Sequence, residues 1–241
     1  MLWRAAHLCR GEARRVKAAS YPCPLPHCGS STEYALAFDS GRMRRILLIP
    51  ALLDEGNRMR RFSVEVMRRL DGAGFDCFLP DLPGTNESTV DLASVAPSDW
   101  HSATAAAASA FGATHVLAIR GGGLLWPEGL PGWHYGAVKG ASLLRTLLRA
   151  RVIAAREAGR EETAEALLAE ANERGIELAG YPLSAAMVRE LSALAPTPRS
   201  NVQVIDQDLL GGSPLWLRAE PDEDAGQADA LAAVIAMSLN A

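Results

Sequence analysis

Thr114-His115-Val116-Leu117-Ala118-Ile119-Arg120-Gly121-Gly122-Gly123 is the stretch that decides how this chain folds. Its first six residues form a short and largely apolar run, which is typical of a strand buried on both faces of a parallel sheet. An arginine and three glycines follow at once, and small residues there allow the chain to turn sharply. The stretch therefore predicts a central buried strand that ends in a tight turn at Arg120.

Similar strands and two helices precede this stretch. Residues 44–50 (RRILLIP) and residues 75–80 (FDCFLP) are short runs closed by proline, and each predicts a further buried strand. Residues 59–70, after a polar loop at residues 53–58, and residues 100–111 are expected to be helices. Strands that alternate with helices of about ten residues indicate a parallel sheet with right-handed crossovers. The predicted fold class is therefore α/β, with a doubly wound, mostly parallel sheet.

The second half of the chain adds a helical insertion and more strands. Residues 133–196 carry three helical patterns, the first with a leucine stripe interleaved with arginines. An insertion of this kind between strands commonly forms a lid over a site. Residues 201–205 and 214–219 are expected to be strands, and residues 227–240 a closing helix. We expect the following division of the chain: an irregular N-terminal segment at 1–32, a core at 33–132 and 197–241, and a helical cap at 133–196.

Composition and charge exclude several classes of protein. The 241 residues include 24 Lys+Arg and 28 Asp+Glu, a formal net charge of -4. A general nucleic-acid-binding protein needs surplus cations, so we expect no nucleic acid partner. No stretch approaches the roughly 18 uninterrupted apolar residues of a membrane-spanning helix. The N-terminal charges do not precede an apolar block as in a secretory signal, so we expect a cytoplasmic protein.

The cysteines predict neither a disulfide framework nor a metal site. Four are scattered through the chain: Cys9, Cys23, Cys28 and Cys77. Their spacing with His7 and His27 does not match the short ligand pairs that zinc prefers. The triple glycine belongs to no Walker motif, and Trp126 stands where a dinucleotide-binding pattern needs glycine. We therefore expect no metal and no cofactor.

The order of these elements resembles the α/β-hydrolase fold. In that fold a G-x-S-x-G turn between a strand and a helix carries the nucleophile, and the loop after the first buried strand supplies an oxyanion amide. The turn falls here on Ala118-Ile119-Arg120-Gly121-Gly122. The resemblance therefore makes Arg120 the residue at the nucleophile position, and Leu52 and Gly121 candidates for ligand binding. Pro50-Ala51 stand where many hydrolases have His-Gly.

The arginine argues against an ordinary serine esterase. A guanidinium stays protonated at any working pH and cannot attack a carbonyl. In this fold the acid and the histidine follow the nucleophile in chain order, and the last histidine of this chain is His134. Asp206 and Asp208 could take the acid position, but without an imidazole to orient. We therefore expect no recognisable Ser-His-Asp triad.

More narrowly, the chain resembles the exosortase A system-associated hydrolase 2 family of the bacterial PEP-CTERM system, which also carries arginine at its elbow. The acidic-Asn-basic loop of that family is matched by residues 54–61 (DEGNRMRR), and its late cap segment by residues 177–183 (ELAGYPL). The similarity spans roughly residues 45–195. It implies a hydrolase by family name, or a pseudoenzyme that serves an exosortase-linked export or exopolysaccharide pathway as an interaction or scaffold protein.

Three interpretations of Arg120 are open. It could receive a carboxylate, phosphate or thioester-linked group together with the amides of the following helix, so that the protein binds a small acyl or anionic ligand under the cap. It could instead pair internally with Asp54 or Glu55 and organise a former active site. In the third interpretation it lies exposed and inert.

The remaining catalytic candidates are carboxylates. Glu55 or Asp81 could activate water while Arg120 stabilises developing negative charge. Asp81 lies at the carboxyl end of an expected strand, where ligands bind. The same residue also begins an Asp-x-Pro-Gly turn, which needs no function to explain it.

The remaining binding candidates are polar or basic. Asn57 could donate into a pocket or cap the helix expected from Met59. His134, near the cap entrance, could contact a ligand or be a plain loop residue, and Arg60 is expected on a solvated helix face. The cap arginines could dock a protein partner or a membrane surface: Arg145, Arg149 and Arg151. The oligomeric state is not predicted.

Overall fold

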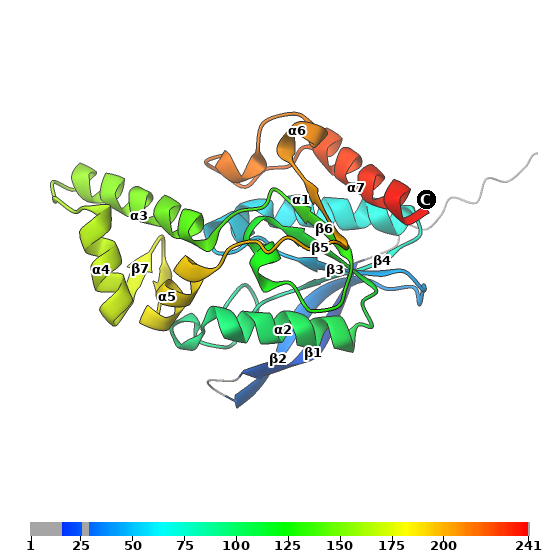
Figure 1. The fold of residues 1–241 in the computed structure, drawn as a ribbon, viewed down its shortest axis with the longest axis horizontal. Helices are drawn as coiled ribbons and strands as arrows, with labels where there is room; N and C mark the ends of the chain where they lie inside the picture. Colours follow the sequence, from blue (N-terminus) through cyan, green and yellow to red (C-terminus); the bar gives the residue numbers. More distant parts are fainter. Residues whose placement is uncertain (1–15, 26–28, 241) are drawn as a thin grey trace, which may run out of the picture.

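A seven-stranded sheet forms the centre of the protein, in a computed structural model that describes residues 16–25 and 29–240 (Figure 1). In sheet order the strands are β1 (Lys17–Leu25), β2 (Gly29–Phe38), β4 (Asp76–Pro80), β3 (Arg45–Ile49), β5 (His115–Ile119), β6 (Gly132–Tyr135) and β9 (Val202–Ile205). β2 pairs antiparallel with β1 and β4, and the other pairings are parallel. The prediction of a mostly parallel α/β sheet is confirmed.

Helices cover both faces of the sheet. α1 (Asp54–Gly72) and α7 (Ala225–Asn240) lie on one face and α2 (Pro97–Ala110) on the other (Figure 1). Alternate residues of a strand point to opposite faces. Ile46 of β3 accordingly packs in the core under α1 and α7, and its neighbour Leu47 packs in the core under α2. Both faces being buried explains why the central strands are uninterrupted apolar runs.

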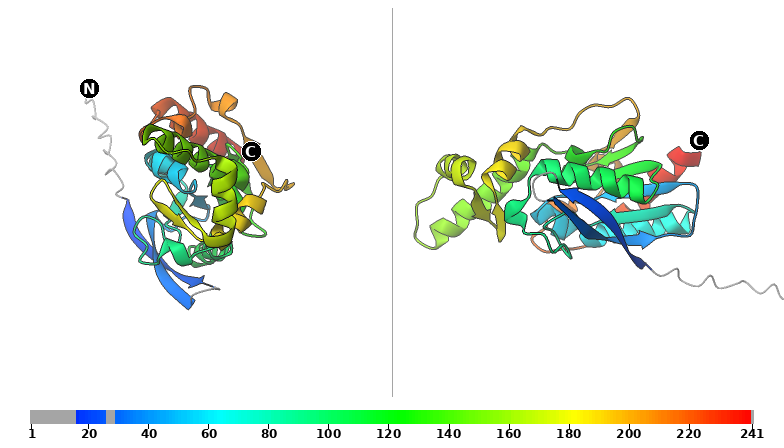
Figure 2. Two further views of the ribbon diagram at one scale, coloured as in Figure 1. Left: turned by 90° about the vertical axis from the view of Figure 1, so that its left-hand side faces the viewer. Right: turned by 90° about the horizontal axis from the view of Figure 1, so that it is seen from below.

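A mixed insertion lies between β6 and β9 at one end of the molecule (Figures 1 and 2). Its elements are α3 (Gly140–Glu157), α4 (Ala164–Arg174), the strands β7 (Ile176–Leu178) and β8 (Tyr181–Leu183), and α5 (Ala185–Ala193). β7 and β8 pair as an antiparallel hairpin, so this part of the chain is not purely helical. The α3 leucines are buried inside the protein, so that stripe is not available to a membrane surface: Leu143, Leu144, Leu147 and Leu148.

The boundaries differ from the sequence expectations at the N-terminus and at the insertion. Residues 17–32, expected to be irregular, form β1 and the first part of β2, because Tyr21, Cys23 and Leu25 alternate inward along β1. Residues 1–15 lie outside the described part of the chain. β6 extends to Tyr135 within the central sheet, so the insertion begins after the predicted boundary at residue 133.

Two local elements were also predicted wrongly. Residues 54–58 are the first turns of α1 rather than a loop, with Asp54 and Glu55 in the first turn, where a negative charge favours the helix dipole. Residues 214–219 form no strand, and the 3-10 helix η3 (Leu215–Leu217) lies there. Between β9 and η3 lies the short helix α6 (Gln207–Leu210), and η1 (Leu92–Ser94) precedes α2. Within the described residues, none of the helices combines the length and apolarity that a membrane crossing needs.

Candidate functional site

The elbow, the turn at residues 118–122, has the strained geometry that the sequence predicts. Arg120 has φ +53°, in the left-handed region that non-glycine residues seldom adopt. The chain continues as a 3-10 helix, η2 (Arg120–Leu125), instead of an α-helix. A Cβ on Gly122 would lie 2.5 Å from the carbonyl oxygen of Pro50, so the elbow packs directly against the end of β3. Glycine is required here for close backbone approach.

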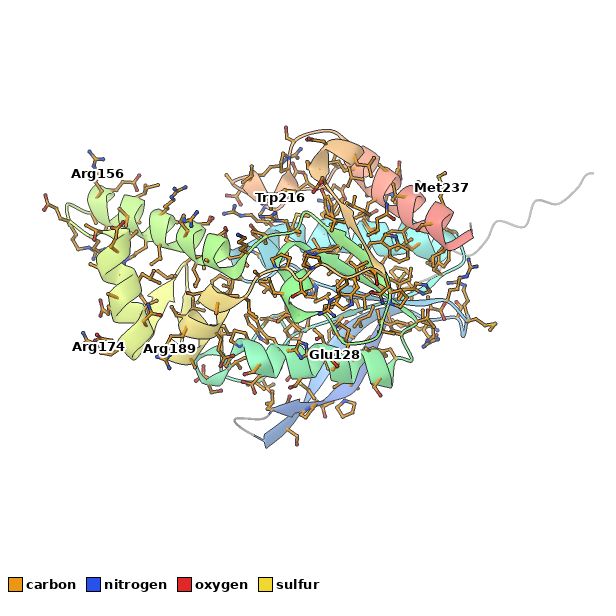
Figure 3. All side chains as sticks on the ribbon, in the orientation of Figure 1. Glu128, Arg156, Arg174, Arg189, Trp216 and Met237 are labelled. Atoms are coloured by element: carbon orange, nitrogen blue, oxygen red, sulfur yellow. The ribbon has the colours of Figure 1, made fainter. Side chains whose placement is uncertain are left out.

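The Arg120 side chain is engaged inside the protein. Its Nε and Nη2 donate to the two carboxylate oxygens of Glu55, at 2.9 and 2.8 Å, and Nη1 donates to the Gly136 carbonyl at 2.7 Å. The guanidinium carbon lies 4.1 Å from the ring centroid of Trp216, which is labelled in Figure 3. The Arg120 and Glu55 side chains are 11% and 12% exposed. Of the three interpretations, internal pairing is the one that matches this geometry, and the exposed, inert interpretation is wrong.

This arrangement changes what the elbow can do chemically. Both oxygens of Glu55 are engaged by a permanent cation, so the carboxylate is not placed as a free general base. η2 is a short 3-10 helix, so the α-helical amides expected to assist Arg120 are not present there. An arginine carries five N–H donors, and three are used here, which leaves two for a ligand.

A cavity of about 280 Å³ adjoins the guanidinium, and we call it the elbow cavity. Its walls come from the start of α1, from α3 and from η3: Leu52, Leu53, Asp54, Glu55, Arg58, Arg120, Leu143, Thr146, Leu147, Trp216 and Leu217. Arg58 pairs with Asp54 at 2.6 Å and donates to the Trp216 carbonyl at 3.1 Å. The elbow cavity therefore combines leucine walls with two guanidinium groups.

Of the two positions after β3 and β5 proposed for ligand binding, Leu52 and Gly121, only Leu52 borders a cavity. A Cβ on Gly121 would lie 2.7 Å from Cδ1 of Leu143 and 3.0 Å from Cγ of Leu52, so leucine side chains fill the space beside it. Leu52 lines the elbow cavity, and Gly121 does not.

His134 forms a hydrogen bond with the backbone of the elbow and does not face a ligand cavity. Its Nε2 donates to the Arg120 carbonyl at 2.7 Å, since a carbonyl can only accept, and its ring occupies the space that a Cβ on Gly123 would need. Burial lowers the pKa of His134 and so does the charge of Arg120, although the hydrogen bond opposes them. His134 lines neither the elbow cavity nor the strand-end cavity described below.

Asp81 is a buried structural acceptor. Its carboxylate is fully buried and accepts from Nη1 of Arg60 at 2.7 Å and from Nδ2 of Asn86 at 3.0 Å. The Tyr21 hydroxyl donates to the Asp81 carbonyl at 2.7 Å. A water that must be activated cannot reach a carboxylate so enclosed, which argues against a catalytic role. Arg60, expected on a solvated face, is 27% exposed and held by this ion pair.

Asn57 does not cap a helix, because α1 begins three residues before it. It lines a second cavity of about 230 Å³, which we call the strand-end cavity because it lies where β3 and β4 end. The residues around it are Pro50, Ala51, Leu52, Leu53, Gly56, Asn57, Arg60, Ser63, Leu79, Leu82, Gly84, Thr85, Asn86, Trp100 and Tyr181. The structure thus divides the predicted ligand residues between two cavities: Arg120 lines one, Asn57 the other, and Leu52 both.

Asp206 directly follows β9, in the chain position expected for the acid of a triad. Across residues 16–25 and 29–240, no serine hydroxyl is hydrogen-bonded to a histidine ring. Thr114 Oγ1 lies 2.9 Å from Nδ1 of His115, but at the start of β5, where the same hydroxyl also bonds the Arg45 backbone.

No metal-binding cluster is found in the described part of the chain, where no three His, Cys, Asp or Glu side chains are grouped to hold an ion. Cys9, Cys28, His7 and His27 lie outside the described residues. Cys23 and Cys77 are buried thiols.

Comparisons with known proteins agree with this architecture. No protein-family model and no curated protein sequence match the chain. Among solved structures, mouse alpha/beta hydrolase domain-containing protein 10 superposes with a TM-score of 0.55 at 13% identity, covering 94% of this chain and 98% of that one. Rv0554 from Mycobacterium tuberculosis gives 0.50 at 11% identity, covering 92% and 97%. A protein from Agrobacterium vitis S4 gives 0.50 at 11%, covering 94% and 98%.

At these identities the likeness concerns the fold alone. It extends over nearly the whole of each chain, and it agrees with the strand order and with the sharp turn after β5. This chain therefore has the α/β-hydrolase fold.

Proposed function

We propose that this protein is a non-catalytic member of the α/β-hydrolase fold that binds a small acyl or anionic ligand in the elbow cavity. The observation that carries the proposal is the arginine at the nucleophile position, held by both oxygens of Glu55. A guanidinium cannot form an acyl intermediate, and the described residues offer no serine-histidine pair to replace it.

The lining of the elbow cavity supports a ligand of this chemistry. The leucines and Trp216 can pack against a short acyl chain. The two N–H groups of Arg120 that form no hydrogen bond in the protein can donate to a carboxylate or phosphate. A ligand carboxylate offers a guanidinium the same two-pronged geometry as Glu55, so it can share or replace that partner. The resemblance to the exosortase A system-associated hydrolase 2 family extends the proposal to a bacterial export or exopolysaccharide pathway.

A second candidate function is that of a scaffold or interaction protein of the same pathway. Arg145 and Arg149 lie one turn apart on α3, both exposed, and within the described residues neither forms an ion pair. Arg151, by contrast, is held by Glu162 at 2.8 Å. The two unpaired arginines favour a partner with an acidic surface.

The first experiment separates binding from turnover. Purified protein is incubated with activated esters and thioesters, and the Arg120→Ala variant is tested beside it. We expect no turnover above background by either protein. Saturable turnover by the wild type that disappears in Arg120→Ala would establish an enzyme and reject the proposal.

The second experiment locates the ligand. Native mass spectrometry of freshly purified protein is expected to show a bound acyl or phosphorylated metabolite. Thr146→Phe, on the wall of the elbow cavity, should abolish retention, whereas Ala150→Phe, one turn further along α3 and outside the lining, should retain the ligand. Retention by both variants would place the ligand elsewhere.

A further inference from the structure

We infer that the strand-end cavity is a second ligand site, which takes a short aliphatic carboxylate. The strand-end and elbow cavities have only the Leu52–Leu53 wall in common. The inference therefore does not depend on the proposed function of the elbow cavity.

The position of this cavity follows from the topology. The chain leaves β3 through α1 to reach β4 on one side, and then crosses through α2 to reach β5 on the other side of β3. Because α1 and α2 lie on opposite faces, the segments that follow β3 and β4 diverge and leave a crevice at the carboxyl ends of the strands. Leu79, Leu82 and Trp100 give this crevice apolar walls.

Several polar groups that line the cavity have no partner in the protein. The amide of the exposed Asn57 and the hydroxyl of the half-buried Tyr181 form no side-chain hydrogen bond within the described structure, and Arg60 uses only Nη1, on Asp81. The hydroxyls of Ser63 and Thr85 are already bonded to the carbonyls of Met59 and Leu82. The groups left over can all act as donors.

Donors of this kind favour an acceptor-rich anion. Burial raises the pKa of Tyr181, so its hydroxyl keeps its proton and donates. Asp81 accepts one hydrogen bond from Nη1 of Arg60, which leaves the other N–H groups of the guanidinium for a second carboxylate. The Asp81 oxygens also accept from Asn86 and from the Glu87 amide, and Asp81 is not among the lining residues. A ligand would therefore contact the donors and not the Asp81 oxygens.

The volume limits the length of the ligand. A cavity of about 230 Å³ is smaller than the range of roughly 300–1,000 Å³ for drug-sized ligands. If a methylene group takes about as much room as a water molecule, roughly 30 Å³, a carboxylate and about five carbons fill it. Hexanoate, with five carbons beyond its carboxylate, is therefore the longest acid expected to fit, and butyrate is shorter than this limit.

The two cavities contain different tryptophans, which makes the test direct. Trp100 lines the strand-end cavity and Trp216 the elbow cavity. The protein is labelled with 15N-tryptophan, and each indole N–H signal is assigned by Trp→Phe substitution. Sodium butyrate and sodium hexanoate are titrated to about 10 mM, a range that detects millimolar affinity, with sodium chloride as the ionic-strength control. We expect saturable movement of the Trp100 signal.

Single-residue variants then test which lining residues contribute to hexanoate binding. Asn57→Asp places a negative charge at the cavity and should weaken hexanoate binding at least tenfold. Tyr181→Phe, which removes only the hydroxyl, should weaken it about tenfold or more, as loss of a hydrogen bond to a charged group does. Asn201→Asp, the matched change at the opposite edge of the sheet just before β9, should leave binding unchanged. Each variant is first checked for a wild-type midpoint of thermal unfolding.

Four results would overturn the inference. The first is the absence of any saturable Trp100 shift with either carboxylate. The second is movement of Trp216 alone, which would place the ligand in the elbow cavity and leave the proposed function standing. The third is equal affinity for methyl hexanoate and hexanoate, which would show that the donors do not select an anion. The fourth is obtained by titrating inorganic phosphate in the same way. Tighter binding of phosphate than of hexanoate would show that the cavity does not select a carboxylate.

Discussion

At the scale of single residues, the decisive feature is the Arg120 guanidinium, which occupies the position where the fold usually carries a nucleophile. The sequence predicts Arg120 at a sharp turn and names Glu55 as one of two internal partners. It does not predict Gly136 and Trp216, because these contacts depend on how the segments after β6 and β9 are folded over the elbow. Arg60 is predicted on a solvated face and pairs instead with Asp81, the residue directly after β4.

Loss of one member of the Arg120–Glu55 pair should destabilise the fold strongly. Arg120→Met or Glu55→Leu leaves an uncompensated, nearly buried charge, and we expect a loss of about 3–5 kcal/mol in the free energy of unfolding. The double variant should cost less than the sum of the two. The free energy of unfolding of the three variants is measured by urea denaturation, with tryptophan fluorescence as the signal. Arg61→Ala, in an exposed pair with Glu223, is the control and should cost at most about 1 kcal/mol.

His134 should make stability fall in mild acid. Burial lowers its pKa below the ordinary 6.5, so the unfolded chain binds a proton more readily than the folded protein. Stability is therefore lost as the pH drops below about 6.5, by up to about 1.4 kcal/mol per pH unit from this group, and is unaffected by it above that pH. Urea denaturation at pH 7.5 and 5.5 should give a smaller difference for His134→Asn than for the wild type. The exposed His101→Asn should behave like the wild type, and equal differences in all three would contradict the assignment.

At the scale of elements, the sequence predicts β3, β4, β5 and β9 and misses β1 and β6. β3 and β5 are continuous apolar runs, and both were predicted. β1 was missed because Pro22 and Pro24 interrupt it, although both point outward on an edge strand. β6 was missed because Gly132 packs against the Val116 backbone and His134 against Gly123, and this tertiary packing selects small or polar residues.

The elbow glycines should tolerate no side chain. In Gly122→Ala the new methyl group would meet backbone oxygens of β3, which cannot move aside, so we expect a loss of about 1–3 kcal/mol. Gly72→Ala is the matched control, because it stands in α1 with open space around it. Replacing a helical glycine by alanine should stabilise by roughly 0.4–1 kcal/mol. Thermal unfolding of the two variants should therefore shift in opposite directions.

At the scale of the whole molecule, the sheet ends in an exposed strand. β9 pairs only with β6, and Val204 is 55% exposed on it. An unpaired strand edge is a template for association with another chain.

A charge on this edge should reduce aggregation. Val204→Lys is expected to lower light scattering during heating and to change the free energy of unfolding by no more than about 0.5 kcal/mol, since little buried surface is lost. Met43→Lys, which adds the same charge at a residue 91% exposed in a loop, is the control. Equal suppression by both variants would show that net charge, and not the strand edge, governs aggregation.

The Arg120 guanidinium joins the elbow to the first turn of α1, to the residue after β6 and to η3. Exchanging Arg120 for serine would remove all three attachments at once. The identity of the side chain at the turn and the packing of the three elements around it therefore cannot change independently.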